Sequence, residues 1–270
     1  MTEPVNVPAS LVKKLRDETG APMMDCKRAL QETKLDFEAA KIWLRERGIA
    51  QAAKRADRST SEGLVGYRLA DDGSKGVMVA VGCETEPVSK NEEFQTFAKK
   101  VLDIVDAKGA GAASELNAER TELSAKLGEN IVVVGSAHYE ATNGEFISAY
   151  AHPPANKLGV LVQLKGGDAE FGRKLAMHIA ASNPQWIGRD DVPADAIASE
   201  REIYANSDEV QSKPEQAREK IVEGMLNKRF FGANVLLDQE WVHDSSKSVG
   251  QALKEAGAEV LDFERFSVVG

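Results

Sequence analysis

The sequence predicts an α+β protein in which a small helical domain precedes a core that repeats a β-β-α-α-β order. Three observations support this prediction. Short segments with helical apolar spacing fill the first 60 residues, strand-like apolar runs open each half of the core, and a long polar helical segment interrupts the second half. The chain has 270 residues, of which 42% are hydrophobic and 29% charged, a composition typical of globular proteins.

Charge is distributed unevenly along the chain. The formal net charge is −9, yet residues 1–60 contain 12 Lys and Arg against 9 Asp and Glu, so the acidic excess lies in the core. We therefore expect no direct nucleic-acid partner. No apolar run is long enough to span a bilayer and the N-terminus lacks a signal-peptide pattern, so we expect a cytoplasmic protein without a membrane partner. Cys26 and Cys83 form no disulfide framework and are expected to be structural thiols.

Residues 1–57 are predicted to form a three-helix domain and a linker. Apolar positions recur at helical spacing on each helix: Leu11 and Leu15; Met23, Cys26 and Leu30; Phe37, Ala40 and Leu44. Pro22 suits the first turn of the second helix, and Asp36 can cap the third. Gly48 is expected to end the third helix. On the second helix Met24, Lys27 and Arg28 then face outward, while Met23 is left open between core and surface.

A basic run of Lys54, Arg55 and Arg58 follows the third predicted helix. A solvated helix face is the favoured interpretation. A phosphate-binding role is the alternative, and it is weaker because no aromatic residues interleave to stack bases.

Residues 58–141 and 142–270 are predicted to be two halves of a duplicated core. The first half has strands at 64–70, 77–83 and 130–140, with helices between the second and third strands. The second half repeats this order, with strands at 146–152, 158–165 and 258–269 and helices at 169–181 and 248–257. The similarity is one of pattern more than identity, so duplication is a hypothesis.

An insertion at 192–230 breaks the symmetry of the two halves and is predicted to be an antiparallel helical hairpin. Ala217, Ile221 and Met225 make a narrow apolar seam on the second arm, facing Ile197 and Tyr204 on the first. Arms this polar project into solvent or onto a partner, and the sequence leaves both open.

No catalytic or cofactor motif is present. The sequence lacks a phosphate-binding P-loop, a nucleophile elbow and zinc-ligand spacing among its histidines, so we expect no enzyme activity, cofactor or metal site. His178 lies beside an apolar helical stripe and is interpreted as a core or boundary histidine.

The segment from Cys83 to Asn91 leaves an apolar strand and enters a helix. In the simpler interpretation Pro87 ends the strand, and Ser89 with Glu92 forms a capping box for the helix. In the functional interpretation the segment presents a stiff acidic surface to a partner.

Four segments resemble motifs of the bacterial translation elongation factor Ts family, in the same order and over nearly the whole chain. They are LRDETGAPMMDCKRALQET (15–33), CETEPVSKNEEF (83–94), AMHIAASNPQW (176–186) and VEGMLNKRF (222–230). The resemblance implies a non-enzymatic guanine-nucleotide exchange factor for elongation factor Tu, which binds Tu with GDP or without nucleotide. It also implies a ubiquitin-associated-like (UBA-like) head, a two-part core and a protruding helical hairpin. A homodimer is left open.

The resemblance also assigns roles to residues. Positions Leu15, Met23, Met24 and Lys27 of the head match family positions that contact the partner. Residues Thr85, Glu86, Pro87 and Val88 match a segment that usually reads Thr-Asp-Phe-Val and disturbs the partner's Mg²⁺ site. Glu86 keeps the charge on a longer arm, whereas Pro87 replaces an aromatic wedge, so the sequence leaves open whether the family's aromatic step applies to this chain.

Two other functions remain as alternatives: an RNA-binding protein that uses its basic head, and a ubiquitin-type interaction module. The acidic core opposes the first, and the second leaves the repeated core unexplained.

Overall fold

The computed structural model describes residues 6–269 and has the mixed helix and strand content that the sequence predicts. It divides into two compact units. The first is Met1–Gly66 with Val79–Ser136 and Ser267–Gly270, and the second is Tyr67–Met78 with Ala137–Phe266. The division between these units falls within the strands at 62–69, 75–83 and 132–140. The domain boundaries predicted after residues 57 and 141 therefore stay predictions.

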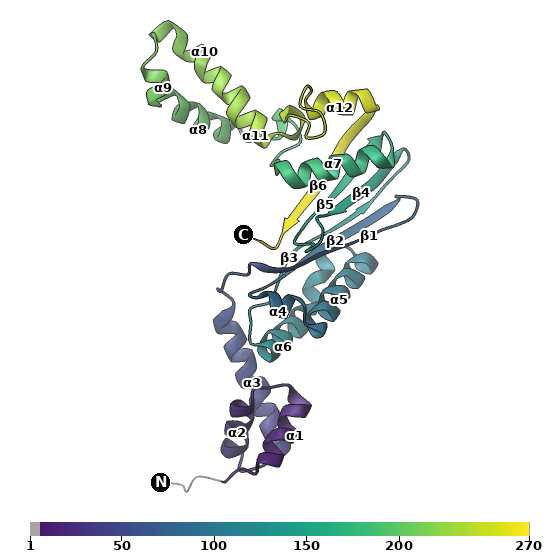
Figure 1. Cartoon of the computed structure of the whole chain (residues 1–270), viewed down its shortest axis with the longest axis vertical. Coiled ribbons are helices and arrows are strands. Elements are labelled where there is room, and N and C mark those ends of the chain that lie inside the picture. The colour runs from purple at the N-terminus through teal and green to yellow at the C-terminus, as the bar shows by residue number, and fades with distance from the viewer. Residues whose placement is uncertain (1–5, 270) are drawn as a thin grey trace. The chain divides into compact units, whose positions relative to one another are not determined.

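The N-terminal part of the first unit is helical (Figure 1). Its helices are α1 (Ala9–Thr19), α2 (Met23–Glu32) and α3 (Phe37–Arg55). Their shared core is fully buried at Leu15, Cys26, Leu30 and Ala40, as the helical spacing predicts. Asp36 caps α3 by accepting a hydrogen bond from the backbone N–H of Ala39 at 2.9 Å.

The predicted end of the third helix at Gly48 is wrong, because α3 continues to Arg55. Gly48 keeps helical geometry, and a Cβ atom placed there would lie 2.9 Å from the Cβ atom of Ala125 in α6 (Asn117–Leu127). The glycine therefore serves close helix packing rather than a helix stop. Gly20, by contrast, has φ 68° and does end α1.

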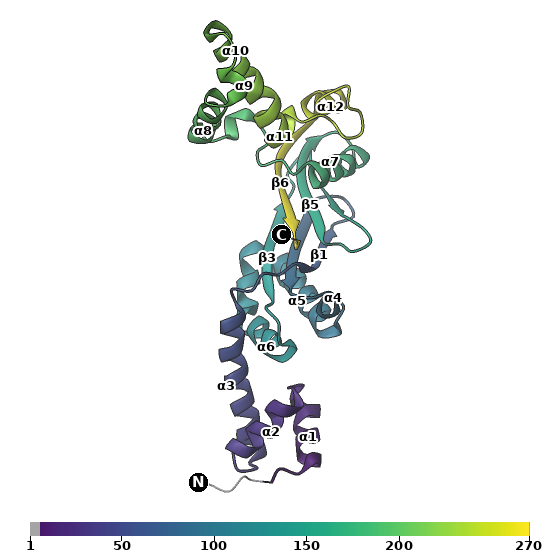
Figure 2. The same ribbon diagram turned by 60° about the vertical axis from the view of Figure 1, so that its left-hand side comes forward.

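The first sheet has the strand order β1-β2-β3, and the chain between its second and third strands is helical. Its strands are β1 (Glu62–Leu69), β2 (Lys75–Cys83) and β3 (Val132–Glu140). Between β2 and β3 the chain forms α4 (Glu86–Ser89), α5 (Glu92–Lys108), η1 (Ala110–Leu116) and α6. Helices α5 and α6 lie side by side in both views (Figures 1 and 2). The predicted apolar face of α5, from Phe94 to Val105, is buried.

The second sheet has the order β4-β5-β6. Its strands are β4 (Glu145–Ala151), β5 (Leu158–Gly166) and β6 (Ala258–Ser267). Strands β4 and β5 are antiparallel, with Tyr150 opposite Val160. Helix α7 (Ala169–Ser182) packs on both, and α12 (Val249–Ala256) precedes β6. The core of this unit joins Val160 and Leu164 of β5 to Leu175 and Ile179 of α7.

The insertion is helical, as predicted, and α8 packs against α10. Its helices are α8 (Ala194–Ala205), α9 (Asp208–Gln211), α10 (Glu215–Met225) and η3 (Leu226–Phe231), preceded by η2 (Arg189–Asp191) and followed by α11 (Gly232–Asn234) and η4 (Leu236–Asp238). Its core is wider than the predicted seam, because Val210 of α9 and the rings of Phe230 and Phe231 are also buried there. These aromatic residues lie on η3, a turn of π-helix.

Candidate functional site

The turn after β2 presents the four residues singled out from the sequence. Strand β2 is buried through Cys83, and the chain then turns at Glu84. Thr85 has extended backbone angles and precedes α4, whose first turn contains Pro87. Side chains Thr85, Glu86 and Pro87 are exposed, and Val88 is half-buried. The turn therefore offers a threonine, a carboxylate and a rigid ring to solvent.

Helix α4 is a single turn that is stiffened by its own side chains. The Ser89 hydroxyl donates a hydrogen bond to the carbonyl oxygen of Glu86 at 2.7 Å, and the ring of Pro87 fixes one backbone angle. The Glu86 carboxylate pairs with the Lys90 ammonium at 2.7 Å, and this contact raises the pKa of Lys90. The prediction that Pro87 ends the strand is wrong, because β2 already ends at Cys83 and Pro87 lies in the first turn of α4.

The predicted capping box of Ser89 and Glu92 is wrong. Ser89 belongs to α4, and Asn91 caps α5 instead, accepting hydrogen bonds from the backbone N–H groups of Glu93 at 2.8 Å and Phe94 at 3.4 Å. The extra turn of α4 moves the N-cap of the long helix by two residues, from the predicted Ser89 to Asn91. The physical reason is that Pro87 suits a first helical turn, which then ends before α5 begins.

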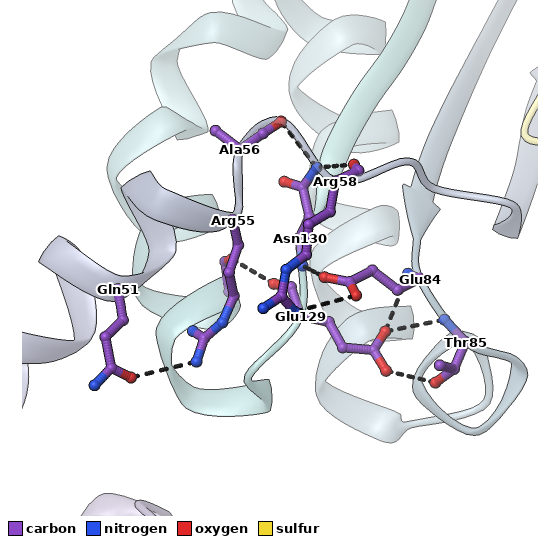
Figure 3. Close-up of polar contacts among 9 residues, drawn as sticks. Gln51, Arg55, Ala56, Arg58, Glu84, Thr85, Glu129 and Asn130 are labelled. Carbon is purple, nitrogen blue, oxygen red and sulfur yellow. Dashed lines mark hydrogen bonds and ion pairs between the residues drawn. The ribbon is translucent and has the colours of Figure 1, made fainter.

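The carboxylate of Glu129, in the loop between α6 and β3, holds the base of this turn (Figure 3). One oxygen, Oε2, accepts hydrogen bonds from the backbone N–H groups of Glu84 and Thr85, each at 3.0 Å. The other, Oε1, accepts a hydrogen bond from the Thr85 hydroxyl. One side chain thus receives three donors from two consecutive residues.

Asn130 connects the same turn to the chain that leaves α3 (Figure 3). Its backbone N–H donates to Glu84 Oε1 at 2.7 Å. Its side-chain amide, which is buried, donates to the carbonyl oxygens of Ala56 at 3.1 Å and Arg58 at 2.8 Å. The Arg58 guanidinium in turn contacts Glu84 Oε2 at 3.4 Å. The three segments form one polar network.

The predicted contact residues of the head divide into two groups. Met23 and Met24 of α2 are 48% and 66% exposed, and Lys27 is exposed on the same helix. Met23, which the sequence left open between core and surface, therefore lies at the surface. Leu15 is 0% exposed inside the three-helix core, so its expected direct contact with a partner is wrong for this structure. Large flexible methionines at a helix surface suit an adaptable apolar contact.

The basic run after the head is partly engaged within the chain. Arg58 contacts Glu84, and Arg55 Nη2 donates to Gln51 Oε1 at 3.3 Å (Figure 3). These contacts reduce the charge available to phosphate groups. They favour the structural interpretation of the run over the phosphate-binding one.

Sequence reasoning missed Glu129 and Asn130. The available local signal is Gly128, which has φ 76° and ends α6, so that the next residues form a tight loop. The carboxylate of Glu129 meets Thr85 across 44 residues of sequence, and no local pattern reports such a contact.

Three general features complete the description of residues 6–269. Among them no group of three or more His, Cys, Asp or Glu residues could hold a metal ion. No helix in this range combines the length and apolar character required to cross a bilayer. Cys26 and Cys83 are buried thiols that form no disulfide, and burial raises the pKa of Cys26.

Comparison with known proteins finds a matching family model and several similar sequences. The family model described as Elongation factor TS matches residues 84–270. An elongation factor Ts of Saccharopolyspora erythraea is 44% identical over 279 residues, covering 97% of this chain and 98% of the relative. One of Halorhodospira halophila is 42% identical over 274 residues, and one of Thioalkalivibrio sulfidiphilus is 40% identical over 274 residues. Both alignments cover 98% of this chain and 92% of the relative.

Proposed function

The chain belongs to the elongation factor Ts family, and we infer from this membership that it is a guanine-nucleotide exchange factor for elongation factor Tu in translation elongation. It promotes the release of GDP from elongation factor Tu, so that GTP can bind. The observation that carries this assignment is the similarity along nearly the whole chain, at about 40% identity or above in the relatives described. Exchange of this kind makes and breaks no covalent bond in the exchange factor.

We propose that Thr85, Glu86, Pro87 and Val88 form the element that displaces the partner's Mg²⁺ site. Support comes from their exposure at the end of a buried strand and from the single stiff turn of α4 that contains them. Mg²⁺ requires near-ideal octahedral geometry at about 2.1 Å, so a small movement of its ligands is costly. Glu86 can add a carboxylate near that ion, and Pro87 can act as a rigid wedge in place of an aromatic side chain.

Exchange by this route is a coupling between two binding events on one partner. The exchange factor and the nucleotide each weaken the binding of the other by the same factor, as thermodynamic linkage requires. A coupling free energy of about 3 kcal/mol corresponds to a change of roughly 150-fold in nucleotide affinity. The proposed element must therefore be held firmly enough for binding energy from the rest of the interface to act on the nucleotide site.

The head is proposed as the docking surface that supplies part of this binding energy. Met23, Met24 and Lys27 are exposed on α2 and contact the partner, whereas Leu15 supports them from the core of the head. We also propose that the head is UBA-like and that the core arose by duplication. The matching orders β1-β2-β3 and β4-β5-β6, each with helices between its last two strands in sequence, support the duplication.

The test is release of a fluorescent GDP from elongation factor Tu, followed by stopped flow at saturating exchange factor. The wild-type chain accelerates release, and a variant with Gly and Ser at residues 85–88 loses most of that acceleration. A matched control is Glu119→Gln on α6, which removes an exposed carboxylate of the same unit that pairs with Lys100. Release as fast as wild type after the 85–88 replacement refutes the proposed element. No acceleration by the wild-type chain refutes the function itself.

The state of the partner is a further expectation. The chain is expected to bind elongation factor Tu both with GDP and without nucleotide, and the nucleotide-free complex is expected to dissociate when GDP is added. A homodimer and the absence of direct nucleic-acid binding also stay predictions. Sedimentation of the chain alone checks the first, and a filter assay against tRNA at several salt concentrations checks the second.

A further inference from the structure

We propose that Glu129 is a positioning residue for nucleotide exchange. Its carboxylate fixes the base of the displacing turn, so that Thr85–Val88 keep their position on the first unit when the turn meets the partner. This inference rests on the proposed role of residues 85–88. It assigns a function to a side chain that lies outside every motif singled out in the sequence.

The contacts of Glu129 are concentrated on two consecutive residues. Both carboxylate oxygens point to the same turn, and together they accept hydrogen bonds from the N–H of Glu84, the N–H of Thr85 and the Thr85 hydroxyl (Figure 3). Hydrogen bonds to an ionised acceptor are stronger than neutral ones, and three of them on one residue pair restrict both its position and its rotation. Thr85 is the residue that precedes α4, so its orientation sets the direction of that helical turn.

The loop that contains Glu129 is itself held by hydrogen bonds from α6. The Ser124 hydroxyl of α6 donates to the carbonyl oxygen of Glu129, and Arg120 Nη1 of the same helix donates to the carbonyl oxygen of Ile131 at 2.8 Å. Ile131 is fully buried. The loop between α6 and β3 is therefore held by α6 at Glu129 itself and again two residues later, next to the buried core.

The displacing turn needs such a support because it carries few buried contacts of its own. Three of its four residues are exposed, and α4 is one helical turn long. A turn anchored only at the end of β2 would bend when it meets the partner, and binding energy would be lost in that movement. Preorganisation by a second set of contacts limits this loss.

Asn130 extends the same network to the head. Its buried amide holds the carbonyl oxygens of Ala56 and Arg58, directly after α3, while its backbone N–H holds Glu84. The residues that join the head to the core and the residues that carry the displacing turn thus share one loop.

The experiment measures GDP release from elongation factor Tu as a function of exchange-factor concentration, which separates the maximum rate from the half-saturating concentration. Glu129→Ala removes all three acceptor contacts, so the maximum rate is expected to fall about tenfold, the ratio expected for loss of a charge-assisted contact. The half-saturating concentration stays near the wild-type value, because the docking surface of α2 is unchanged. Glu119→Ala on α6, the helix that precedes the loop of Glu129, is the matched control and leaves both values unchanged.

A conservative variant separates positioning from general stability. In Glu129→Gln the amide oxygen can accept from both N–H groups and the amide nitrogen can donate to the Thr85 hydroxyl oxygen, so the maximum rate is expected to recover to within about threefold of wild type. Hydrogen exchange of the free Glu129→Ala protein is expected to speed up in residues 86–90 and not in α5. If the alanine variant does not fold, Glu129→Asp, whose shorter arm cannot reach every donor, carries the same test.

The outcomes distinguish this inference from the proposed function. An unchanged maximum rate in a folded Glu129→Ala protein overturns the positioning role, and so does an effect confined to the half-saturating concentration. If the 85–88 replacement abolishes acceleration while Glu129→Ala does not, the displacing element stands and the positioning role falls. If the 85–88 replacement has no effect, the displacing element itself is wrong.

Discussion

A fall in pH below neutrality is predicted to destabilise the second unit through His178. This histidine is 0% exposed on α7, between the second sheet and the segment that follows the helical insertion. The backbone N–H of Val242 donates to His178 Nδ1 at 3.3 Å, so Nδ1 carries no proton. The other ring nitrogen, Nε2, then carries the proton and donates to Gln239 Oε1 at 2.9 Å. Protonation of Nδ1 would set two N–H groups against each other.

The magnitude follows from the pKa of the two states. Burial lowers the pKa of His178 in the folded chain below its ordinary value of 6.5, and the nearby His243 acts in the same direction. Below that ordinary value the unfolded chain therefore binds a proton that the folded chain does not. The free energy of unfolding therefore has its full value above the pKa that His178 has in the unfolded chain, and it falls as the pH decreases through that value. Between about pH 7.5 and about pH 5.5, the loss in the free energy of unfolding is at most about 1.4 kcal/mol, the limit for a histidine that the fold keeps neutral throughout.

The assay is urea unfolding followed by circular dichroism at a series of pH values, for the wild-type chain and for His178→Gln. The variant is less stable throughout but lacks the titrating group, so its free energy of unfolding should change less over this pH range, by up to about 1.4 kcal/mol. Parallel loss of stability in both proteins would refute the reasoning and assign the pH effect to other groups. Tryptophan fluorescence gives a second readout, because one of the three tryptophans, Trp241, stacks on His178 with ring centroids 5.2 Å apart.

Further substitutions test individual contacts. Leu15→Ala removes a fully buried side chain and should lower the free energy of unfolding by about 2–5 kcal/mol, measured by urea unfolding of the head. Met24→Ala should change stability by less than about 0.5 kcal/mol while lowering affinity for elongation factor Tu in calorimetry. Gly48→Ala should not stabilise α3 by the roughly 1 kcal/mol expected of an open helix, because its Cβ atom meets α6, and thermal melting checks this. Arg189→Ala removes a bidentate ion pair with half-buried Asp238 and the guanidinium contact over the Phe231 ring, so its cost in urea unfolding should exceed the roughly 1 kcal/mol of a simple exposed pair.

Local patterns account for most of the elements. Helical spacing identified the buried faces of α2 and α5, because those faces are made within one segment of chain. The same reasoning identified His178 as a core residue. It failed at Gly48, where a glycine looked like a helix stop although its actual role depends on a distant helix. A single residue type has several structural uses, and only the fold selects one of them.

The candidate site shows the same limit. The sequence identified the exposed part of the turn, since Pro87 and its neighbours depart from a regular strand or helix pattern. It did not identify Glu129, because a glutamate after a helix stop is unremarkable in sequence and acquires its role only by meeting Thr85 across 44 residues. Leu15 shows the converse: its place in a motif suggested contact with a partner, but its burial assigns it to the core of the head.

In the proposed displacing element, Pro87 takes the place of an aromatic wedge. An aromatic side chain acts by size and reaches its target even from a turn that yields. A proline ring is smaller, so it can act only if the backbone that carries it does not give way. In this chain the ring lies in a helical turn closed by Ser89, with its base held by Glu129. Small size at position 87 and strong anchoring at position 85 are therefore complementary, and an aromatic side chain at position 87 should make exchange less sensitive to the loss of Glu129.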